Sequence, residues 1–502
     1  MARAGARPLA NRHRSAGAAP SPQEGSTVFA LSQRDRERLA ARIALAVKRA
    51  RRGGGEVLAS ITVALDARVD PSAVVCASRR DGESWFVFEQ PDRGRAALAA
   101  LGEATSLQAA GEERFASVAD RWRALAAAAV ADPADEPAAG GGAVAVGGFA
   151  FAPHGGAAPH WRGFQPASLT VPELALVRKT HGGQEGVHMT LVALARPDDV
   201  PEQLLARLER RVSELRTVPL PLLDPAPTGR FQVASAMPPE HYEQAVARAT
   251  QLIGEGQLQK IVLAREVQVH APRAYDPTAV FGVLREEFPS CFVFCVGRGE
   301  ASLIAASPEL LVRREGHRVS TLALAGSSRR SADPAVDAHL GEQLLRDASY
   351  REEHAIVARR IERTLRPHAI WVTGAPEPGL ARIANIQHLA TPIRAQLAAP
   401  MDALELAELM HPTPAVGGEP LGRAAPLIPA LEGLDRGWYT GPVGWTDATG
   451  DGEFCVALRC ALLRENVARC YAGNGIVRHS DPAAELAETE IKLQALLPLL
   501  AG

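Results

Sequence analysis

Apolar and polar positions along this 502-residue chain follow a helical period in some segments and a strand period in others. Helical spacing predicts helices at 32–51, 93–130, 201–215, 241–253, 344–365 and 403–410. Two-residue alternation or short apolar runs predict strands at 143–151, 168–178, 260–269, 292–296 and 303–306, and hairpins at 73–89, 310–324 and 438–477. Because the strands group in hairpins and do not alternate regularly with helices, the pattern indicates an α+β fold with antiparallel sheets.

The ends and the middle of the chain differ in composition. Residues 1–27 are rich in Arg, Ala and Pro and have no apolar pattern, which predicts a disordered tail. They lack the apolar core of a secretory signal, and an Arg-rich organellar transit segment is the alternative. Prolines clustered in 218–239 mark a boundary between an N-terminal α+β portion, 28–235, and a second portion, 236–502. A surface crossover inside one domain would give the same pattern.

Composition then narrows the class of protein. The chain is 46% hydrophobic and 22% charged, as in a soluble globular protein with an ample core, and its formal net charge is −2. Nucleic-acid binding would need a basic stripe, and a membrane span would need about 18 consecutive apolar residues. The sequence has neither. Its six Cys show no C-x-x-C spacing, which is typical of reduced, buried thiols in a cytoplasmic protein.

The late stretch 472–493 carries the densest candidate chemistry. A Gly-Asn-Gly sequence at 473–475 predicts a turn, and Asp-Pro at 481–482 predicts the start of a helix. Glu485, Glu488 and Lys492 follow at offsets of three and four, so they share one helical face. Carboxylate oxygens are ligands that Mg²⁺ prefers. The alternative is a solvated face with a Glu488–Lys492 surface pair.

Four further residues have a chemical and a structural interpretation. Glu353, in a predicted helix, could join Glu488 in a metal site or lie exposed. Glu309 follows a strand and could be a general acid or a strand-end cap. Lys260, one of only four Lys among 55 basic residues, starts an apolar strand, where a buried amine can act as a base or reach water at an edge. Arg459 could point inward to a carboxylate or outward to solvent.

These residues lie in segments that resemble a known family. From about residue 241 to 493, the chain is similar to the chorismate-binding domain of isochorismate, salicylate, anthranilate and aminodeoxychorismate synthases. The similar segments are QKIVLAR at 259–265, ASPELLVR at 306–313, LALAGSSRR at 322–330, EEH at 352–354, QHLATP at 387–392, HPTPAVGGEP at 411–420, RGWYTGPVGW at 436–445, LRCALLREN at 458–466 and the terminal AGNGIV…ELAETEIKL. The resemblance implies large antiparallel sheets flanked by helices around a central active-site cleft.

Three positions indicate the branch of the family. The resemblance places a Lys, here Lys260, where water is the nucleophile, and a Gln where ammonia is. Aminodeoxychorismate synthases carry a nucleophilic Lys where this chain has Ala325. The segment 411–420 has the isochorismate synthase form. The nearest alternative is a salicylate synthase, which also eliminates pyruvate. An alternative of another class is a catalytically silent binding subunit.

The implied reaction converts chorismate to isochorismate with Mg²⁺. By resemblance, Glu353 and Glu488 hold the ion, with Glu485 nearby through water, and the ion binds the ring carboxylate. Lys260 takes a proton from the water that adds at C2, and Glu309 protonates the hydroxyl that leaves C4. The downstream pathway is left open between menaquinone, a catecholate siderophore and salicylate.

The resemblance also implies the substrate contacts. It assigns them to Ala325, Gly326, His388, Ala415, Tyr439, Arg459, Gly473, Gly475 and Lys492, with the N–H groups of the predicted 473–475 turn holding a carboxylate. Tyr350 departs from relatives that have an acidic or polar residue three positions before the metal Glu. This puts a water-mediated metal contact from that position in doubt. We expect a cytoplasmic monomer with chorismate as its small-molecule partner.

Overall fold

The computed structural model describes residues 29–131, 142–181, 184–383 and 385–502. The predicted tail at 1–27 lies outside the described residues. No helix of the described part is long and apolar enough to cross a membrane.

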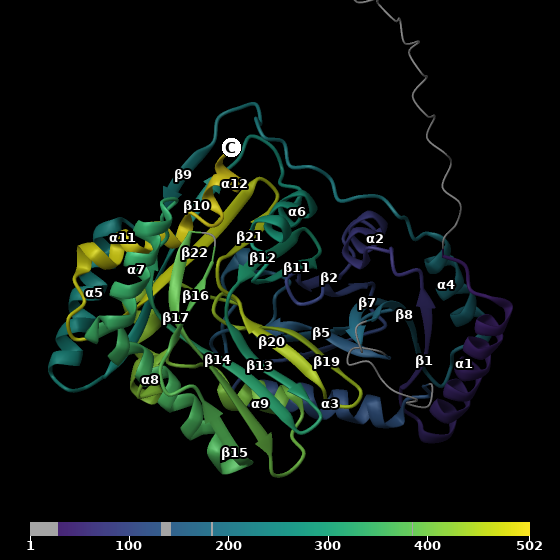
Figure 1. The fold of residues 1–502 in the computed structure, drawn as a ribbon. Helices are drawn as coiled ribbons and strands as arrows, with labels where there is room; N and C mark the ends of the chain where they lie inside the picture. The colour runs from purple at the N-terminus through teal and green to yellow at the C-terminus, as the bar shows by residue number, and fades with distance from the viewer. Residues whose placement is uncertain (1–28, 132–141, 182–183, 384) are drawn as a thin grey trace, which may run out of the picture.

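Two large sheets form the body of the protein (Figure 1). The twelve-stranded sheet has the order β1 (Val57–Leu65), β8 (Gln184–Ala195), β7 (Leu174–His181), β3 (Ala96–Leu101), β2 (Trp85–Gln90), β11 (Phe292–Arg298), β12 (Ala301–Ser307), β21 (Cys460–Arg464), β22 (Val467–Ile476), β10 (Lys260–His270) and β18 (Gly418–Glu419), with β9 (Gln232–Ser235) also paired to β10. The ten-stranded sheet has the order β15 (Ala369–Gly374), β17 (Ile386–Leu397), β14 (Arg318–Arg329), β13 (Leu310–Glu315), β20 (Gly452–Val456), β19 (Pro442–Asp447), β5 (Val144–Phe149), β6 (Ala167–Val171) and β4 (Thr105–Ala109), with β16 (Gly379–Arg382) paired to β17.

Each ladder between these strands is antiparallel, which confirms the α+β class. A core of aromatic and aliphatic side chains from both sheets fills the space between them, with Phe86 and Phe294 on one side and Val144 and Val443 on the other. Both sheets combine strands from before and after residue 236. The division at 235/236 is therefore a division of the sequence and not of the sheets, because strands of both portions belong to each sheet.

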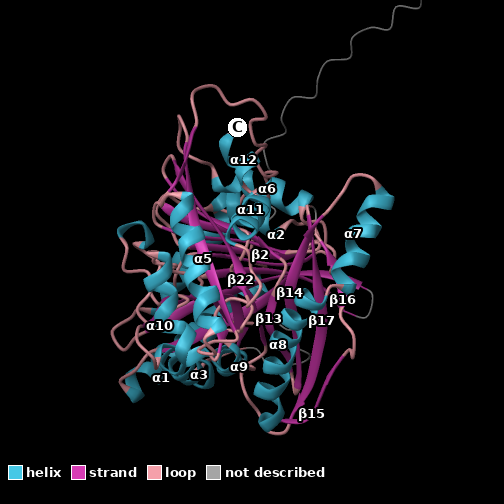
Figure 2. Ribbon diagram, turned by 90° about the vertical axis from the view of Figure 1, so that its left-hand side faces the viewer, coloured by secondary structure: helices cyan, strands magenta, loops and turns pink. Residues whose placement is uncertain are grey.

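The helices cover the outer faces and ends of the sheets (Figures 1 and 2). They are α1 (Gln33–Gly53), α2 (Pro71–Ser78), α3 (Arg114–Ala128), α4 (Pro201–Ser213), α5 (Pro239–Gly254), α6 (Pro277–Glu287), α7 (Pro334–Arg346), α8 (Ala348–Leu365), α9 (Ala403–Met410), α10 (Leu421–Glu432), α11 (Pro482–Leu493) and α12 (Leu497–Ala501). The helices α1 and α4 pack together beside β8, while α5 and α11 pack together beside β22. The last pair faces the viewer in Figure 2.

Two predictions in the first portion are wrong. The first half of the predicted hairpin at 73–89 is helix α2, because Asp70 caps it and Pro71 occupies its first turn. The predicted helix at 93–130 is helical only in α3, since its start forms β3 and β4. The Ala-rich β3 is almost wholly buried in the middle of a sheet, and this tertiary context overrides the helix propensity of Ala.

Smaller differences concern element boundaries. The predicted strand at 168–178 is two strands, β6 and β7, and the predicted helix at 344–365 begins within α7 and continues as α8. The break falls at Asp347, whose side chain accepts hydrogen bonds from the N–H groups of Ser349 and Tyr350 and so starts a new helix.

Candidate active site

A cavity of about 350 Å³ lies where β10, β22, β14, α8 and α11 meet. Every residue that the sequence singles out for the site lines it: Lys260, Glu309, Ala325, Gly326, Glu353, His388, Ala415, Tyr439, Arg459, Gly473, Gly475, Glu485, Glu488 and Lys492. Tyr350, the departure from the family pattern, lines it too. Segments far apart in sequence therefore converge on one space, while the roles of the individual residues stay predictions.

Lys260, the first residue of β10, lines the cavity. Its side chain is 1% exposed, and its Nζ lies 2.8 Å from Oε1 of Glu353 on α8. A fully buried ammonium is tolerated only beside an opposite charge, so this contact explains how a Lys can begin an apolar strand. The alternative of a Lys that reaches water at an edge does not describe this side chain.

The acidic face of α11 lines the same cavity. Asp481 caps the helix and Pro482 begins it, as predicted. Glu488 Oε1 lies 2.7 Å from Lys492 Nζ and accepts a 2.5 Å hydrogen bond from Ser327 Oγ. Burial disfavours the ionised form of Glu488, but the Lys492 ammonium and the hydrogen bonds outweigh it and hold the pKa of this carboxyl below its usual value.

Lys492 and Glu485 are both held by Asn474. Lys492 Nζ donates to Asn474 Oδ1 at 2.6 Å and to the Gly473 carbonyl at 3.0 Å. The Asn474 amide donates to Glu485 Oε2 at 2.9 Å. Burial, and then the negative charge of Glu488, raise the pKa of Glu485 to about 7. One Asn thus orients an ammonium and a carboxyl toward the same cavity.

Glu309 differs from Glu353 and Glu488, because it has no ion-pair partner within the described residues. Glu485 has none there either, but it accepts a hydrogen bond from Asn474. Glu309 is 3% exposed and follows β12. Burial raises its pKa to about 8, although the charges of Lys260 and Arg459 act in the opposite direction. A carboxyl in this environment is protonated at neutral pH, which is the state that a general acid needs.

His388 and Arg459 both line the cavity, and their side chains are hydrogen-bonded to each other. His388 Nδ1 lies 3.2 Å from the Gly326 carbonyl, which can only accept, so Nδ1 carries the proton. Its Nε2 then accepts from Arg459 Nη2 at 3.0 Å. Burial and the nearby cations Arg459 and Lys492 hold the pKa of His388 well below its usual value, so the ring is neutral.

The local structure differs from the prediction at Arg459. The sequence suggests an alternating strand there, but Arg459 lies in a bend between β20 and β21 with a φ of +47°. An L-residue rarely adopts this left-handed conformation. The bend brings the guanidinium to the cavity, where its hydrogen-bond partner is His388 and not a carboxylate.

The predicted turn at 473–475 is also wrong, since these residues lie within β22 and pair with β10. A Cβ on Gly475 would lie 2.4 Å from Lys260 Cε and from Glu353 Oε1, so the close approach of these side chains requires Gly. The partners of Gly475 and Gly473 in β10, Val262 and Ala264, donate their N–H groups to Gly417 and Glu432. In an antiparallel ladder both residues of such a pair point their polar groups outward, so the two Gly N–H groups point away from β10.

Residues that the sequence analysis missed also shape the site. Ser327 and Asn474 orient the charged groups of α11. Both lie in segments that carry the family resemblance, but the sequence assigns neither of them a role. Glu432 and Arg436 are buried beneath the cavity wall, where they form an ion pair. In the sequence they are an ordinary i, i+4 pair, and nothing in the spacing reveals that the pair is buried.

The carboxylates fit a magnesium ion only in part. Glu353 and Glu488 each have an ammonium partner, and within the described chain no group of three or more His, Cys, Asp and Glu side chains could hold a metal ion as it stands. Magnesium, however, is typically bound through one or two carboxylates, with water and substrate oxygens completing its shell. A pair of carboxylates that border one cavity is consistent with such a site.

Comparisons with known proteins agree with the geometry. A family model described as chorismate binding enzyme matches residues 45–501. The chain is 38% identical over 416 residues to a salicylate biosynthesis isochorismate synthase of Pseudomonas aeruginosa, covering 83% of this chain and 84% of that protein. It is 33% identical over 361 residues to the isochorismate synthase MenF of Bacillus subtilis, covering 72% and 75%. The solved structure of MenF, the menaquinone-specific isochorismate synthase from Escherichia coli, has a TM-score of 0.73 at 26% identity and covers 91% of this chain and 100% of that one.

Proposed function

This chain belongs to the chorismate-binding enzyme family, and we propose that it is a Mg²⁺-dependent isochorismate synthase. In this reaction a water molecule adds at C2 of chorismate and the C4 hydroxyl leaves as water. The observation that supports the proposal best is the pairing of a buried amine and a buried, protonated carboxyl on the walls of one cavity. Lys260 and Glu309 supply these two groups.

Each of the two groups moves one proton. Lys260 accepts a proton from the attacking water, and this requires the neutral amine, so its own proton must first leave the ion pair with Glu353. Glu309, which burial keeps protonated, donates its proton to the departing hydroxyl. Exchange with solvent restores both groups, so the reaction consumes no net proton.

The remaining charges of the cavity suit a dianionic substrate. Arg459 and Lys492 are the cations available to its carboxylates, and the outward N–H groups of Gly473 and Gly475 add donors. The neutral His388 ring holds Arg459 by accepting its hydrogen bond. Ala415 and Tyr439 lie against the space that the ring would fill.

The proposed function includes a bound Mg²⁺ ion. Glu353 and Glu488 would hold Mg²⁺, with Glu485 nearby. When bound, the ion supplies a positive charge that attracts a substrate carboxylate and draws electron density from the ring. For Glu488→Ala we expect the magnesium concentration at half-maximal activity to rise about 100-fold. An unchanged value would show that the ion binds elsewhere.

Product identification tests the function directly. The purified protein is incubated with chorismate and Mg²⁺, and isochorismate, salicylate and pyruvate are measured by liquid chromatography. We expect isochorismate without pyruvate. Release of pyruvate in amounts equal to salicylate would instead establish a salicylate synthase, and unreacted chorismate would overturn both assignments.

A further inference from the structure

The edge of β10 next to the cavity has an unusual hydrogen-bonding partner. The edge strand β18 pairs only with Lys260 and Ile261, and the N–H of Val262 donates to the Gly417 carbonyl at 2.8 Å. Beyond this point, the next backbone groups on that edge bind side chains. The Val262 carbonyl accepts from Arg436 Nη2 at 3.0 Å, and the Ala264 N–H donates to Glu432 Oε1 at 2.7 Å. Glu432 and Arg436 thus take the place of a neighbouring strand.

Arg436 also binds two loops of the cavity wall. Its Nη1 donates to the Val416 carbonyl at 2.8 Å and to Thr440 Oγ1 at 3.1 Å. Its Nε donates to Glu432 Oε2 at 3.0 Å, and its Nη2 pairs with Glu432 Oε1. Together with the contact to Val262, these bonds use all five N–H donors of the guanidinium. Its Cζ lies over the Phe151 ring, 4.4 Å from the ring centre.

Apart from Glu432, the three residues that Arg436 binds are parts of the cavity lining. Val262 lies two residues after Lys260, Val416 follows Ala415, and Thr440 follows Tyr439. Thr440 Oγ1 also donates to the Tyr439 carbonyl at 2.6 Å. A single buried cation therefore fixes the relative positions of the strand that carries the amine and of both loops that face the ring.

We propose that Arg436, oriented by Glu432, is a positioning residue for the reaction. It holds β10 and the two loops so that Lys260, Ala415 and Tyr439 meet the substrate ring in one geometry. This inference rests on the proposed function for the identity of the reaction. Misplacement of reacting groups by about 1 Å can reduce turnover about 100-fold, so the expected effect is on rate.

A contribution to stability alone does not explain why Glu432 and Arg436 form a buried ion pair here. A buried ion pair is costly to desolvate, and apolar residues of similar volume often stabilise a protein equally well. What apolar residues cannot replace is the set of directed bonds to Val262, Val416 and Thr440. A Lys keeps the charge but has a single nitrogen without the planar fork, so it cannot bind all three groups and Glu432 at once.

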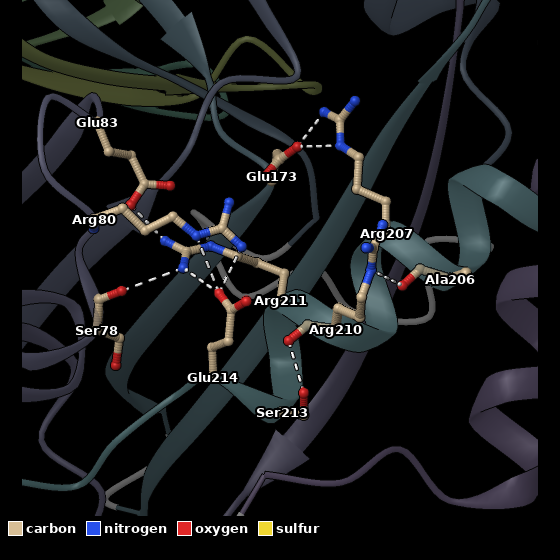
Figure 3. Close-up of polar contacts among 10 residues, drawn as sticks. All are labelled: Ser78, Arg80, Glu83, Glu173, Ala206, Arg207, Arg210, Arg211, Ser213 and Glu214. Carbon is tan, nitrogen blue, oxygen red and sulfur yellow. Dashed lines mark hydrogen bonds and ion pairs between the residues drawn. The ribbon is translucent and has the colours of Figure 1, made fainter.

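The molecule contains a matched control far from these loops. Arg211 on α4 is 1% exposed, and it donates to the Ser78 carbonyl and pairs with Glu83 and Glu214 (Figure 3). Neither Arg211 nor these partners line the catalytic cavity. A loss of activity caused only by loosening a buried Arg would therefore follow Arg211→Lys as well as Arg436→Lys.

The experiment compares the wild-type protein with Arg436→Lys, Arg211→Lys and the double variant Glu432→Met/Arg436→Met. Isochorismate formation is measured at saturating Mg²⁺, well below each melting temperature. We expect kcat to fall about 50-fold in Arg436→Lys and in the double variant, with KM within threefold of wild type. For Arg211→Lys we expect kcat/KM within twofold. The proposal is overturned if either Arg436 variant is folded and keeps kcat within threefold, or if Arg211→Lys loses as much activity.

A measurement without substrate separates this proposal from the proposed function. Amide hydrogen exchange in the ligand-free protein should become faster at 413–417 and 438–441 in both Arg436 variants, while Arg211→Lys should leave these segments unchanged. If the wild-type protein makes no isochorismate, the proposed function fails, and the exchange data still decide whether Arg436 holds the walls. Unchanged exchange in the variants would overturn the positioning role.

Discussion

The α4 end of the molecule and the cavity end both bury cations beside carboxylates, but they use them differently. At α4, Arg211 binds Glu83, Glu214 and the Ser78 carbonyl, and Arg80 joins the same Glu214 (Figure 3). These contacts tie α4 to the segment before β2. At the cavity, Lys260 and Lys492 each pair with one carboxylate that faces a space large enough for a small molecule.

The difference teaches that a buried charge alone does not mark a functional site. The distinguishing features are a shared cavity and a carboxyl, Glu309, that burial keeps protonated without an ion-pair partner within the described residues. If this distinction is correct, substitutions at the cavity should change the reaction, and substitutions at α4 should change only stability.

The largest expected effect comes from Lys260→Ala. Removal of the proposed general base should lower kcat by about 10⁴-fold, the upper end for such catalysis. Chorismate turnover by the purified variant, with folding checked by circular dichroism, measures the effect. A loss below tenfold would mean that another group takes the proton and that Lys260 serves mainly as the partner of Glu353.

Glu309→Gln should follow, with kcat reduced about 10³-fold, because an amide is far too weak an acid to transfer a proton to the leaving hydroxyl. The side chain keeps its size, so chorismate binding by isothermal titration calorimetry should stay within threefold of wild type. Binding that falls in parallel with turnover would assign Glu309 to the scaffold or to substrate binding instead.

The sequence predicts which residues come together in this site better than it predicts the local backbone structure around them. The Asp-Pro cap of α11 and its charged face are visible in the spacing, and the resemblance supplies the partners on other segments. The path of the chain at 473–475 was not accessible, because Gly-Asn-Gly indicates a turn unless its pairing with β10 is known. The bend at Arg459 depends in the same way on where β20 ends and β21 begins.

The Glu432–Arg436 pair shows a further limit. Its i, i+4 spacing is that of a surface pair. The pair is buried because β18 ends beside it and because the loops that contain Val416 and Thr440 pack against Arg436. Non-local packing decided the outcome here, as it did at β3, where an Ala-rich segment became a central strand.

A smaller effect is expected from pH. Because Glu309 must be protonated to act as an acid and its pKa is raised to about 8, kcat should fall about tenfold per pH unit above about 8. The stability of the fold should also decrease with rising pH. The pKa of Glu309 is higher in the folded than in the unfolded protein, so its contribution to the free energy of unfolding is full below the unfolded pKa and is lost as pH rises through about 8. The basic limb should be absent from the residual activity of Glu309→Gln. If it persists there, another group titrates.

The smallest effect on the reaction should come from Arg211→Met, although its effect on stability is large. The substitution leaves Glu83, whose side chain is only 11% exposed, without its cation, which should lower the free energy of unfolding by about 3 kcal/mol. Urea denaturation measures this loss, and kcat/KM at 25 °C should stay within twofold of wild type, because none of the Arg211 contacts reaches the cavity lining. Glu83→Gln/Arg211→Met removes both charges and should recover part of the lost stability. If turnover falls tenfold while the protein stays folded, the two ends of the molecule are coupled, and buried charge at α4 cannot be treated as purely structural.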